Sequence, residues 1–147
     1  PLSRDGTLWG GFVIDSPSGA VDFAGDSALG SFVERVAAAF PRIRLAILPI
    51  GSYEKRWFMR TQHMNPEDAV EVHRRLSAAW SMGMHFGTFV EHPEQAVDAH
   101  IADLAAALER GNVSPAAFRV PAFGEGGDVP PLPADRSSAQ RQVARDE

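Results

Sequence analysis

The stretch LWGGFVIDSPSGAVDFAGD, residues 8–26, decides the fold of this chain. Two apolar runs, residues 7–14 and 20–25, are separated by SPSG, whose serine, proline and glycine are typical of a hairpin loop. We therefore expect two antiparallel strands. Asp26 follows the second run directly. In an α/β sheet, residues at such strand ends lie at one edge of the sheet.

The rest of the chain alternates helical periodicity with short apolar runs. Asn65 before Pro66, followed by Glu67 and Asp68, is typical of a helix start, because it combines a capping side chain, a proline and acids near the positive end of the helix dipole. A long loop, 51–65, is expected before that helix. Overall the periodicity predicts helices over 29–40, 66–79 and 93–110, and strands over 44–50, 80–85 and within 114–120. This order predicts an α/β layered sheet rather than an all-β fold or a helical bundle.

Length and composition indicate one core. The chain has 147 residues, of which 44% are hydrophobic. We expect one domain over 1–120 and a disordered tail over 121–147, which is rich in glycine, proline and charge. The chain starts with Pro1 inside what reads as a loop entering a strand, so we also expect it to begin within a larger protein.

Charge and cysteine content narrow the function classes. The net charge of −5 gives no long-range attraction for nucleic acid, so no nucleic-acid partner is expected. The absence of cysteine leaves His, Asp and Glu as the strong metal ligands and fits a cytoplasmic location, with association at the membrane periphery left open. No apolar run approaches the ~20 residues of a transmembrane segment.

Three metal-competent side chains each follow an apolar run. Asp26 can bridge two divalent ions, but a turn acid that caps the next helix is the commoner interpretation. His85 ends WSMGMH, where a metal and a carbonyl, or two ordinary hydrogen bonds, can satisfy its ring. His63 can be a ligand or a proton donor, although loop histidines are common. A single divalent-metal site can collect all three.

Residues 49–59, PIGSYEKRWFM, suggest substrate contacts. Arg56 offers a guanidinium that binds phosphate, and Tyr53 and Trp57 offer rings that cover an apolar body. Ordinary packing of a loop is the alternative. The other histidines, His73, His92 and His100, are expected at the surface.

Three sequence blocks together indicate a family resemblance: LWGGFVIDSPSGAVDFAGDS, LAILPIGSYEKRWFMRTQHMNPEDAV and MHFGTF. In this order, over about residues 7–90, they resemble the C-terminal half of the metallo-β-lactamase-fold hydrolases related to N-acyl-phosphatidylethanolamine-hydrolysing phospholipase D. The resemblance implies half of an αββα-type α/β fold, a mixed sheet with helices packed on one exposed side. It implies that Asp26 bridges two zinc ions and takes part in catalysis, that His85 binds zinc, and that His63 contacts the substrate phosphate or leaving oxygen.

The chain departs from the family pattern in three respects. Ser27 is followed by Ala28-Leu29-Gly30 where the family continues Gly-Tyr, and Phe86 replaces the usual tryptophan. The motif His-x-His-x-Asp-His, which supplies most zinc ligands in the family, is absent from the 147 residues. The resemblance therefore implies that a missing N-terminal half of the same domain completes the site, and that the fragment alone is inactive.

The expected function is that of a zinc-dependent hydrolase fragment. We expect two zinc ions in the full-length parent and a phosphodiesterase of the phospholipase D type, acting on small-molecule or lipid phosphodiesters such as N-acyl-phosphatidylethanolamine. A metal-dependent lactonase or esterase for a small anionic substrate and a non-catalytic α/β binding domain are the alternatives. A homodimer is compatible with the sequence.

Overall fold

The computed structural model describes residues 10–88 and 98–133. Within these residues the elements follow the order β1 (Phe12–Ile14), β2 (Ala20–Phe23), α1 (Phe32–Ala39), β3 (Ile43–Pro49), α2 (Arg56–Met59), α3 (Pro66–Arg75), β4 (Trp80–Met84), α4 (Ala99–Gly111) and β5 (Phe118–Arg119). None of these helices is long and apolar enough to cross a membrane.

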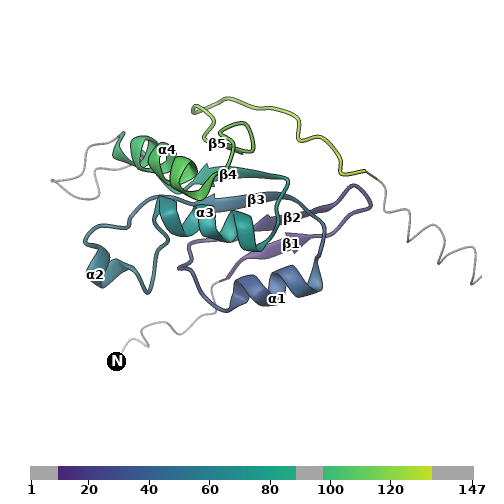
Figure 1. Cartoon of the computed structure of the whole chain (residues 1–147), viewed down its shortest axis with the longest axis horizontal. Helices are drawn as coiled ribbons and strands as arrows, with labels where there is room; N and C mark the ends of the chain where they lie inside the picture. Colours follow the sequence, from purple (N-terminus) through teal and green to yellow (C-terminus); the bar gives the residue numbers. More distant parts are fainter. Residues whose placement is uncertain (1–9, 89–97, 134–147) are drawn as a thin grey trace, which may run out of the picture.

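The strands form one mixed sheet in the order β1-β2-β3-β4-β5 (Figure 1). β1 and β2 are antiparallel, with Val13 opposite Asp22, and this confirms the predicted hairpin. β2, β3, β4 and β5 are mutually parallel neighbours, so the carboxyl ends of β2, β3 and β4 meet at the same edge. The predicted mixed α/β sheet is thus confirmed.

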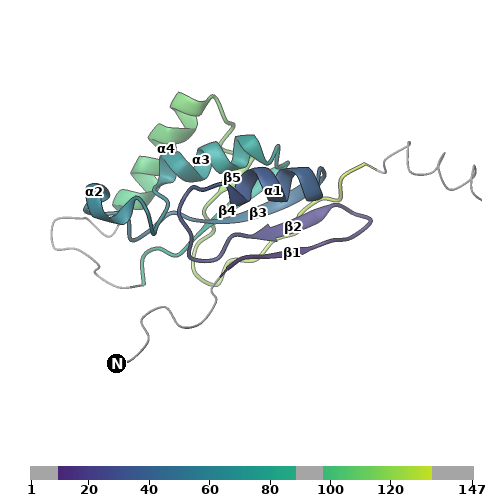
Figure 2. The same ribbon diagram turned by 90° about the horizontal axis from the view of Figure 1, so that it is seen from below.

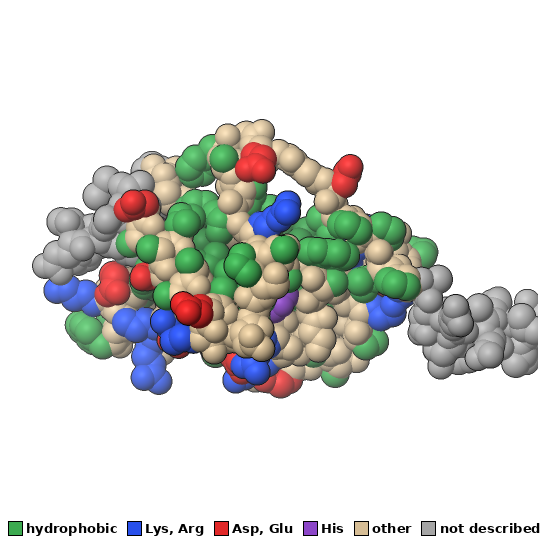
Figure 3. All heavy atoms as spheres, turned by 45° about the horizontal axis from the view of Figure 1, so that its top comes forward, with side chains coloured by type: hydrophobic (Ala, Val, Ile, Leu, Met, Phe, Trp, Pro, Cys, Tyr) green, Lys and Arg blue, Asp and Glu red, His purple; other side chains and the backbone are tan. Residues whose placement is uncertain are grey.

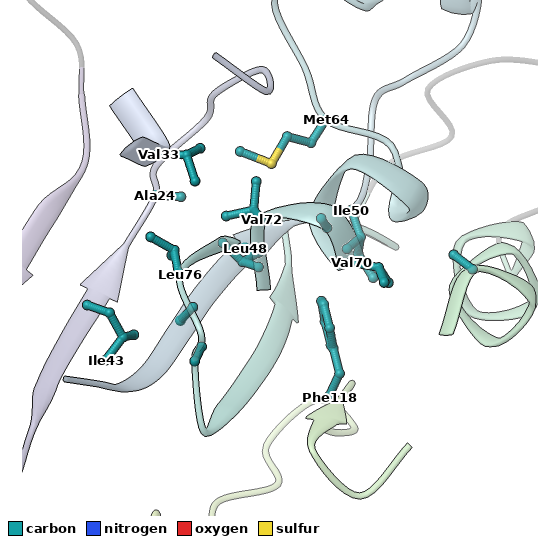
Figure 4. Close-up of a cluster of buried hydrophobic side chains, with 14 of the residues drawn as sticks. Ala24, Val33, Ile43, Leu48, Ile50, Met64, Val70, Val72, Leu76 and Phe118 are labelled. Atoms are coloured by element: carbon teal, nitrogen blue, oxygen red, sulfur yellow. The ribbon is translucent and has the colours of Figure 1, made fainter. Parts of the chain in front are cut away.

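The helices α1 to α4 lie on one side of the sheet, as the view from below shows (Figure 2). α3 packs against β3, α1 and α4. Its start is fixed by a capping box, in which the Asn65 side chain accepts from the N–H of Asp68 at 2.9 Å. The buried core lies between this layer and the sheet (Figure 4) and draws on β3, α3 and the segments beside them: Ile43, Leu48, Ile50, Met64, Val70, Val72, Leu76 and Phe118.

The opposite face of the sheet is apolar and open near β1. Successive side chains of a strand point to opposite faces, so Phe12, Ile14 and Phe23 lie on the side away from the helices, where they are 71%, 67% and 39% exposed. Exposed large hydrophobic groups on one face typically mark an interaction surface.

Several element boundaries differ from the sequence prediction; α1, for example, begins at Phe32 rather than at residue 29. The segment expected to be a loop, 51–65, contains the one-turn helix α2, which is too short for periodicity to reveal. The helix expected over 66–79 ends at Arg75, because the chain turns at Ser77 (φ 49°) to enter β4. Residues 7–9 of the first predicted strand and 93–97 of the last predicted helix lie outside the described residues.

Residues 121–133 contain neither helix nor strand and run along the domain. Leu132 donates its N–H to the Ser18 carbonyl at 2.9 Å, and the Arg42 guanidinium donates to the Pro133 carbonyl at 2.5 Å. Figure 3 shows this segment arching over a face rich in hydrophobic side chains. The remainder of the predicted tail, 134–147, lies outside the described residues, and the domain boundary at residue 120 stays a prediction.

Candidate functional site

The connections that leave three neighbouring parallel strands carry the three predicted site residues. Asp26 lies three residues beyond the end of β2, and His85 follows β4 directly. His63 lies between β3 and α3, two residues before the helix cap Asn65. Because β3 pairs with β2 on one side and with β4 on the other, the three connections share one edge of the sheet.

The side chains of these residues meet. Oδ1 of Asp26 lies 2.6 Å from Nδ1 of His63, and Oδ2 of Asp26 lies 3.5 Å from Nε2 of His85. The two imidazole rings are tilted, with their centres 5.5 Å apart. One donor atom from each residue lies within 4.8 Å of the others. The predicted convergence of Asp26 and His85 at one rim is therefore confirmed, and His63 joins them.

The polar atoms of this cluster fit a bound cation. Nδ1 of His63 is buried and has no hydrogen-bond partner within residues 10–88 and 98–133, because its close approach to Asp26 lacks the angles of a hydrogen bond. A buried ring nitrogen without a hydrogen bond beside a carboxylate leaves room in this cluster for a bound group. The Asp26 carboxylate presents one oxygen to each imidazole, so Asp26 and His85 would be the residues to hold a metal ion here.

The backbone around the cluster is tightly constrained. His85 adopts a left-handed conformation (φ 59°), which is uncommon for a non-glycine residue and typical of functional turns. Gly51 makes this turn possible, because a Cβ there would overlap the His85 carbonyl oxygen. Gly25, also left-handed (φ 65°), precedes Asp26, and a Cβ there would lie 2.7 Å from the carbonyl oxygen of Gly10.

Arg56 organises the loop that carries His63. Its guanidinium donates to the His63 carbonyl at 2.9 Å and forms an ion pair with Asp68 in the first turn of α3. Asp68 thus serves both the capping box and this pair. The sequence marks Asp68 only as a helix-start acid, so the second contact becomes visible only when the loop folds back.

The other two residues predicted to bind substrate lie in different surroundings. Tyr53 is buried, at 4% exposure, and its hydroxyl donates to Asp103 of α4 at 2.5 Å. Trp57 is 78% exposed and packs edge-on against Phe58. The substrate-binding roles of Tyr53, Arg56 and Trp57 remain predictions.

The predicted surface positions of two histidines are wrong. His73 is 8% exposed and shares a 2.8 Å hydrogen bond between its Nδ1 and the Ser81 hydroxyl, and burial lowers its pKa. His100 is 5% exposed and lies edge-on to the ring of Tyr53. Both lie on the inner faces of helices whose sequences contain many charged or small residues, which conceals the burial. His92 lies outside the described residues.

Comparison with protein families supports the assignment of the fold. The family model described as the beta-lactamase superfamily domain matches residues 1–86. Among solved structures, an isothiocyanate hydrolase from Delia radicum gut bacteria superposes with a TM-score of 0.59 at 15% identity, over 82% of this chain and 44% of that one. A metallo hydrolase from Ignicoccus hospitalis gives a TM-score of 0.54 at 23% identity, over 80% and 44%.

Curated relatives share a limited part of their length with this chain. It is 37% identical over 83 residues to N-acyl-phosphatidylethanolamine-hydrolyzing phospholipase D 1 of Caenorhabditis elegans, covering 56% of this chain and 23% of the relative. It is 34% identical over 98 residues to a metal-dependent hydrolase of Methylacidiphilum infernorum, covering 64% and 39%. The chain thus matches about a quarter to two fifths of these relatives.

Proposed function

Because the chain belongs to the β-lactamase superfamily, whose relatives include metal-dependent hydrolases, we propose that it supplies one side of the catalytic centre of a zinc-dependent phosphodiesterase. The convergence of Asp26, His63 and His85 is the observation that carries this proposal. Three polar groups from three separate connections meet at one rim, and none of them belongs to the hydrophobic core.

The geometry supports a distinct role for each residue. Asp26 and His85 would hold metal, with the carboxylate oxygens of Asp26 available to two ions. His63 is held through its own carbonyl by Arg56 and through its N–H by the Met59 carbonyl at 2.8 Å, so its ring has a fixed position beside the metal ligands. In that position it would donate a proton or a hydrogen bond to the leaving oxygen.

Zinc at this site would provide Lewis-acid stabilisation of phosphoryl oxygens and a more acidic water. The remaining catalytic roles would belong to side chains of this chain. Asp26 would fix the position of the metal, and the ring of His63 would protonate the departing alkoxide. Arg56 would contribute by holding the loop that carries His63.

The proposed substrate class is inferred from the relative in Caenorhabditis elegans. The relative from Caenorhabditis elegans hydrolyses N-acyl-phosphatidylethanolamine, and we propose a phosphodiester of that type, small or lipidic, for the protein to which this chain contributes. Exposed Trp57 and Phe58 on α2, next to the His63 loop, suit a substrate with an apolar body.

The exposed apolar face of the sheet suggests that a second layer of structure packs against it. Phe12, Ile14 and Phe23 are exposed there, and the chain covers only 23% of the relative from Caenorhabditis elegans. We propose that the N-terminal half of the same domain packs on this face and brings further zinc ligands to the rim. Sedimentation of the 147-residue chain tests the alternative, since a stable homodimer through this face would replace that layer.

The test is metal content and turnover in the complete protein after changing Asp26 to Asn. We expect loss of zinc by metal analysis and loss of phosphodiester hydrolysis, while Asp128→Asn, at an exposed carboxylate of the C-terminal segment, serves as the control and retains both. Full zinc content and turnover in Asp26→Asn would refute the proposal. Hydrolysis of a lactone or carboxylic ester, but of no phosphodiester, would move the assignment to the esterase alternative.

A further inference from the structure

A cavity lies on the helical side of the sheet, between α1 and the β1–β2 hairpin. It has a volume of about 530 Å³. The hairpin and α1 contribute most of its lining, and Ser27 comes from the connection after β2: Gly10, Gly11, Phe12, Val13, Asp22, Ala24, Ser27, Phe32, Arg35, Val36 and Phe40. A volume of this size is in the range of small-molecule sites.

A buried carboxylate with an unpaired oxygen lines this cavity. Asp22 is 3% exposed, and its Oδ2 has no hydrogen-bond partner among the described residues. The Ser27 hydroxyl, also on the lining, is buried and equally without a partner there. A buried acceptor that lacks a donor is costly, and a buried charge without a counter-charge is costlier, so such atoms call for a ligand or an ordered water.

The other residues that line the cavity indicate which kind of ligand it can bind. Phe32 and Phe40 provide aromatic surface, and Val13 and Val36 add aliphatic surface. Aromatic faces attract cations, and an ammonium group is a donor that can satisfy both Asp22 and Ser27. Arg35 is the other charged residue among the described lining residues; it is exposed and donates to the Ser31 hydroxyl at 3.2 Å, which keeps its charge at the solvent side.

We propose that this cavity binds a small primary amine, whose ammonium group is held by the Asp22 carboxylate and the Ser27 hydroxyl and whose apolar body lies against Phe32 and Phe40. The site is separate from the metal-competent cluster, because neither Asp26, His63 nor His85 lines the cavity. It also does not depend on the proposed hydrolase function, since the binding needs neither metal nor turnover.

The experiment is an NMR titration of the ¹⁵N-labelled chain, without metal, with benzylamine at pH 7.5 and, separately, with its neutral analogue benzyl alcohol. Benzylamine should shift the amide signals of residues 10–13, 22–27 and 32–40. Asp22→Asn, which keeps the shape and removes the charge, should weaken benzylamine at least about tenfold, because a hydrogen bond to a charged group is lost. Asp128→Asn is the matched control at an exposed carboxylate and should leave the affinity unchanged.

The pH dependence of benzylamine binding is a second test of the proposal. Burial raises the pKa of Asp22 to about 6, so the carboxyl group is ionised at pH 7.5 and mostly protonated at pH 5. Benzylamine should therefore bind more weakly at pH 5, while Arg35 keeps its charge at both pH values. The spectrum of Asp22→Asn also shows whether that variant is folded.

Four outcomes would overturn the proposal. The first is the absence of any benzylamine shift, which would leave the cavity to water. The second is equal affinity for benzyl alcohol, which would make the cavity a purely apolar site. The third is undiminished benzylamine binding by folded Asp22→Asn. The fourth is shifts centred on His63 and His85, which would place the amine at Asp26 instead.

Discussion

The backbone N–H of Met64 donates to the carbonyl oxygen of Ser27 at 3.0 Å, and this bond joins the two loops that carry His63 and Asp26. Met64 is fully buried, so its side chain fixes the same junction from the core side. The positions of Asp26 and His63 are thereby linked to the packing of the domain rather than to the loops alone. A substitution that disturbs this junction should therefore also displace Asp26 and His63.

Replacing Asn65 by Ala tests the start of α3. The capping box is lost, and we expect the free energy of unfolding to fall by about 1 kcal/mol. Asp98→Ala is the control, because Asp98 occupies the same position at α4 without a side-chain cap bond and should cost only a few tenths of a kcal/mol. Chemical denaturation of both variants decides the matter, and equal effects would contradict the capping role.

Gly51→Ala tests the contact with the His85 turn. Its Cβ would overlap the His85 carbonyl oxygen, so the strand end or the His85 turn must move, at about 1–3 kcal/mol. Gly126→Ala, where nothing lies within 4 Å of a new Cβ, is the control. Thermal unfolding should show a lower Tm for Gly51→Ala only, and the His85 ring signals should shift in the NMR spectrum.

Zinc binding by the 147-residue chain should be weak. A catalytic zinc usually has three protein ligands, and of the residues that meet here we assign only Asp26 and His85 to the metal. Calorimetric titration should show low affinity that Asp26→Asn weakens further, and the chain alone should not hydrolyse phosphodiesters. Tight binding of two equivalents would show that the ligand assignment is wrong.

His63 and His85 should respond differently to replacement by Asn in the complete protein. For His63→Asn we expect a fall in turnover of about 10²–10⁴-fold with zinc content intact, which is the range for loss of a general acid. For His85→Asn we expect loss of zinc as well. Metal stoichiometry and kcat measured on both variants separate the roles. Equal zinc loss would make His63 a metal ligand.

Asp22 should make stability depend on pH. Burial raises its pKa from 3.8 to about 6, so between these values the folded chain holds a proton that the unfolded chain has released. Stability is therefore unaffected by this group below about pH 4 and falls as pH rises towards 6, by about 3 kcal/mol in all. The difference in unfolding free energy between the wild type and Asp22→Asn, measured from pH 4 to pH 7.5, should grow in favour of the variant. A constant difference would contradict the raised pKa.

Local sequence determined most of the elements, because their signals lie within a few residues. The serine, proline and glycine between two apolar runs predict the β1–β2 hairpin, and Asn65 with Pro66 predicts the start of α3. Asp26, His63 and His85 stand out for a similar reason, since each is a metal-competent group following a short apolar run. Their meeting at one rim follows from the parallel order of the strands, which the alternation of helix and strand already favours.

Tertiary structure alone decided the partners of those side chains. The ion pair of Arg56 with Asp68 and the burial of His73 and His100 depend on which faces of helices and strands come together. The same holds for Oδ2 of Asp22, which finds no hydrogen-bond partner in the described part of the chain. A charged or polar residue has the same local pattern whether it faces water or a neighbouring element, so periodicity cannot separate the two cases. For this reason the sequence identified the metal-competent residues by type, while the packing of α1, α3 and α4 on the sheet determined the burial and contacts of the other polar groups.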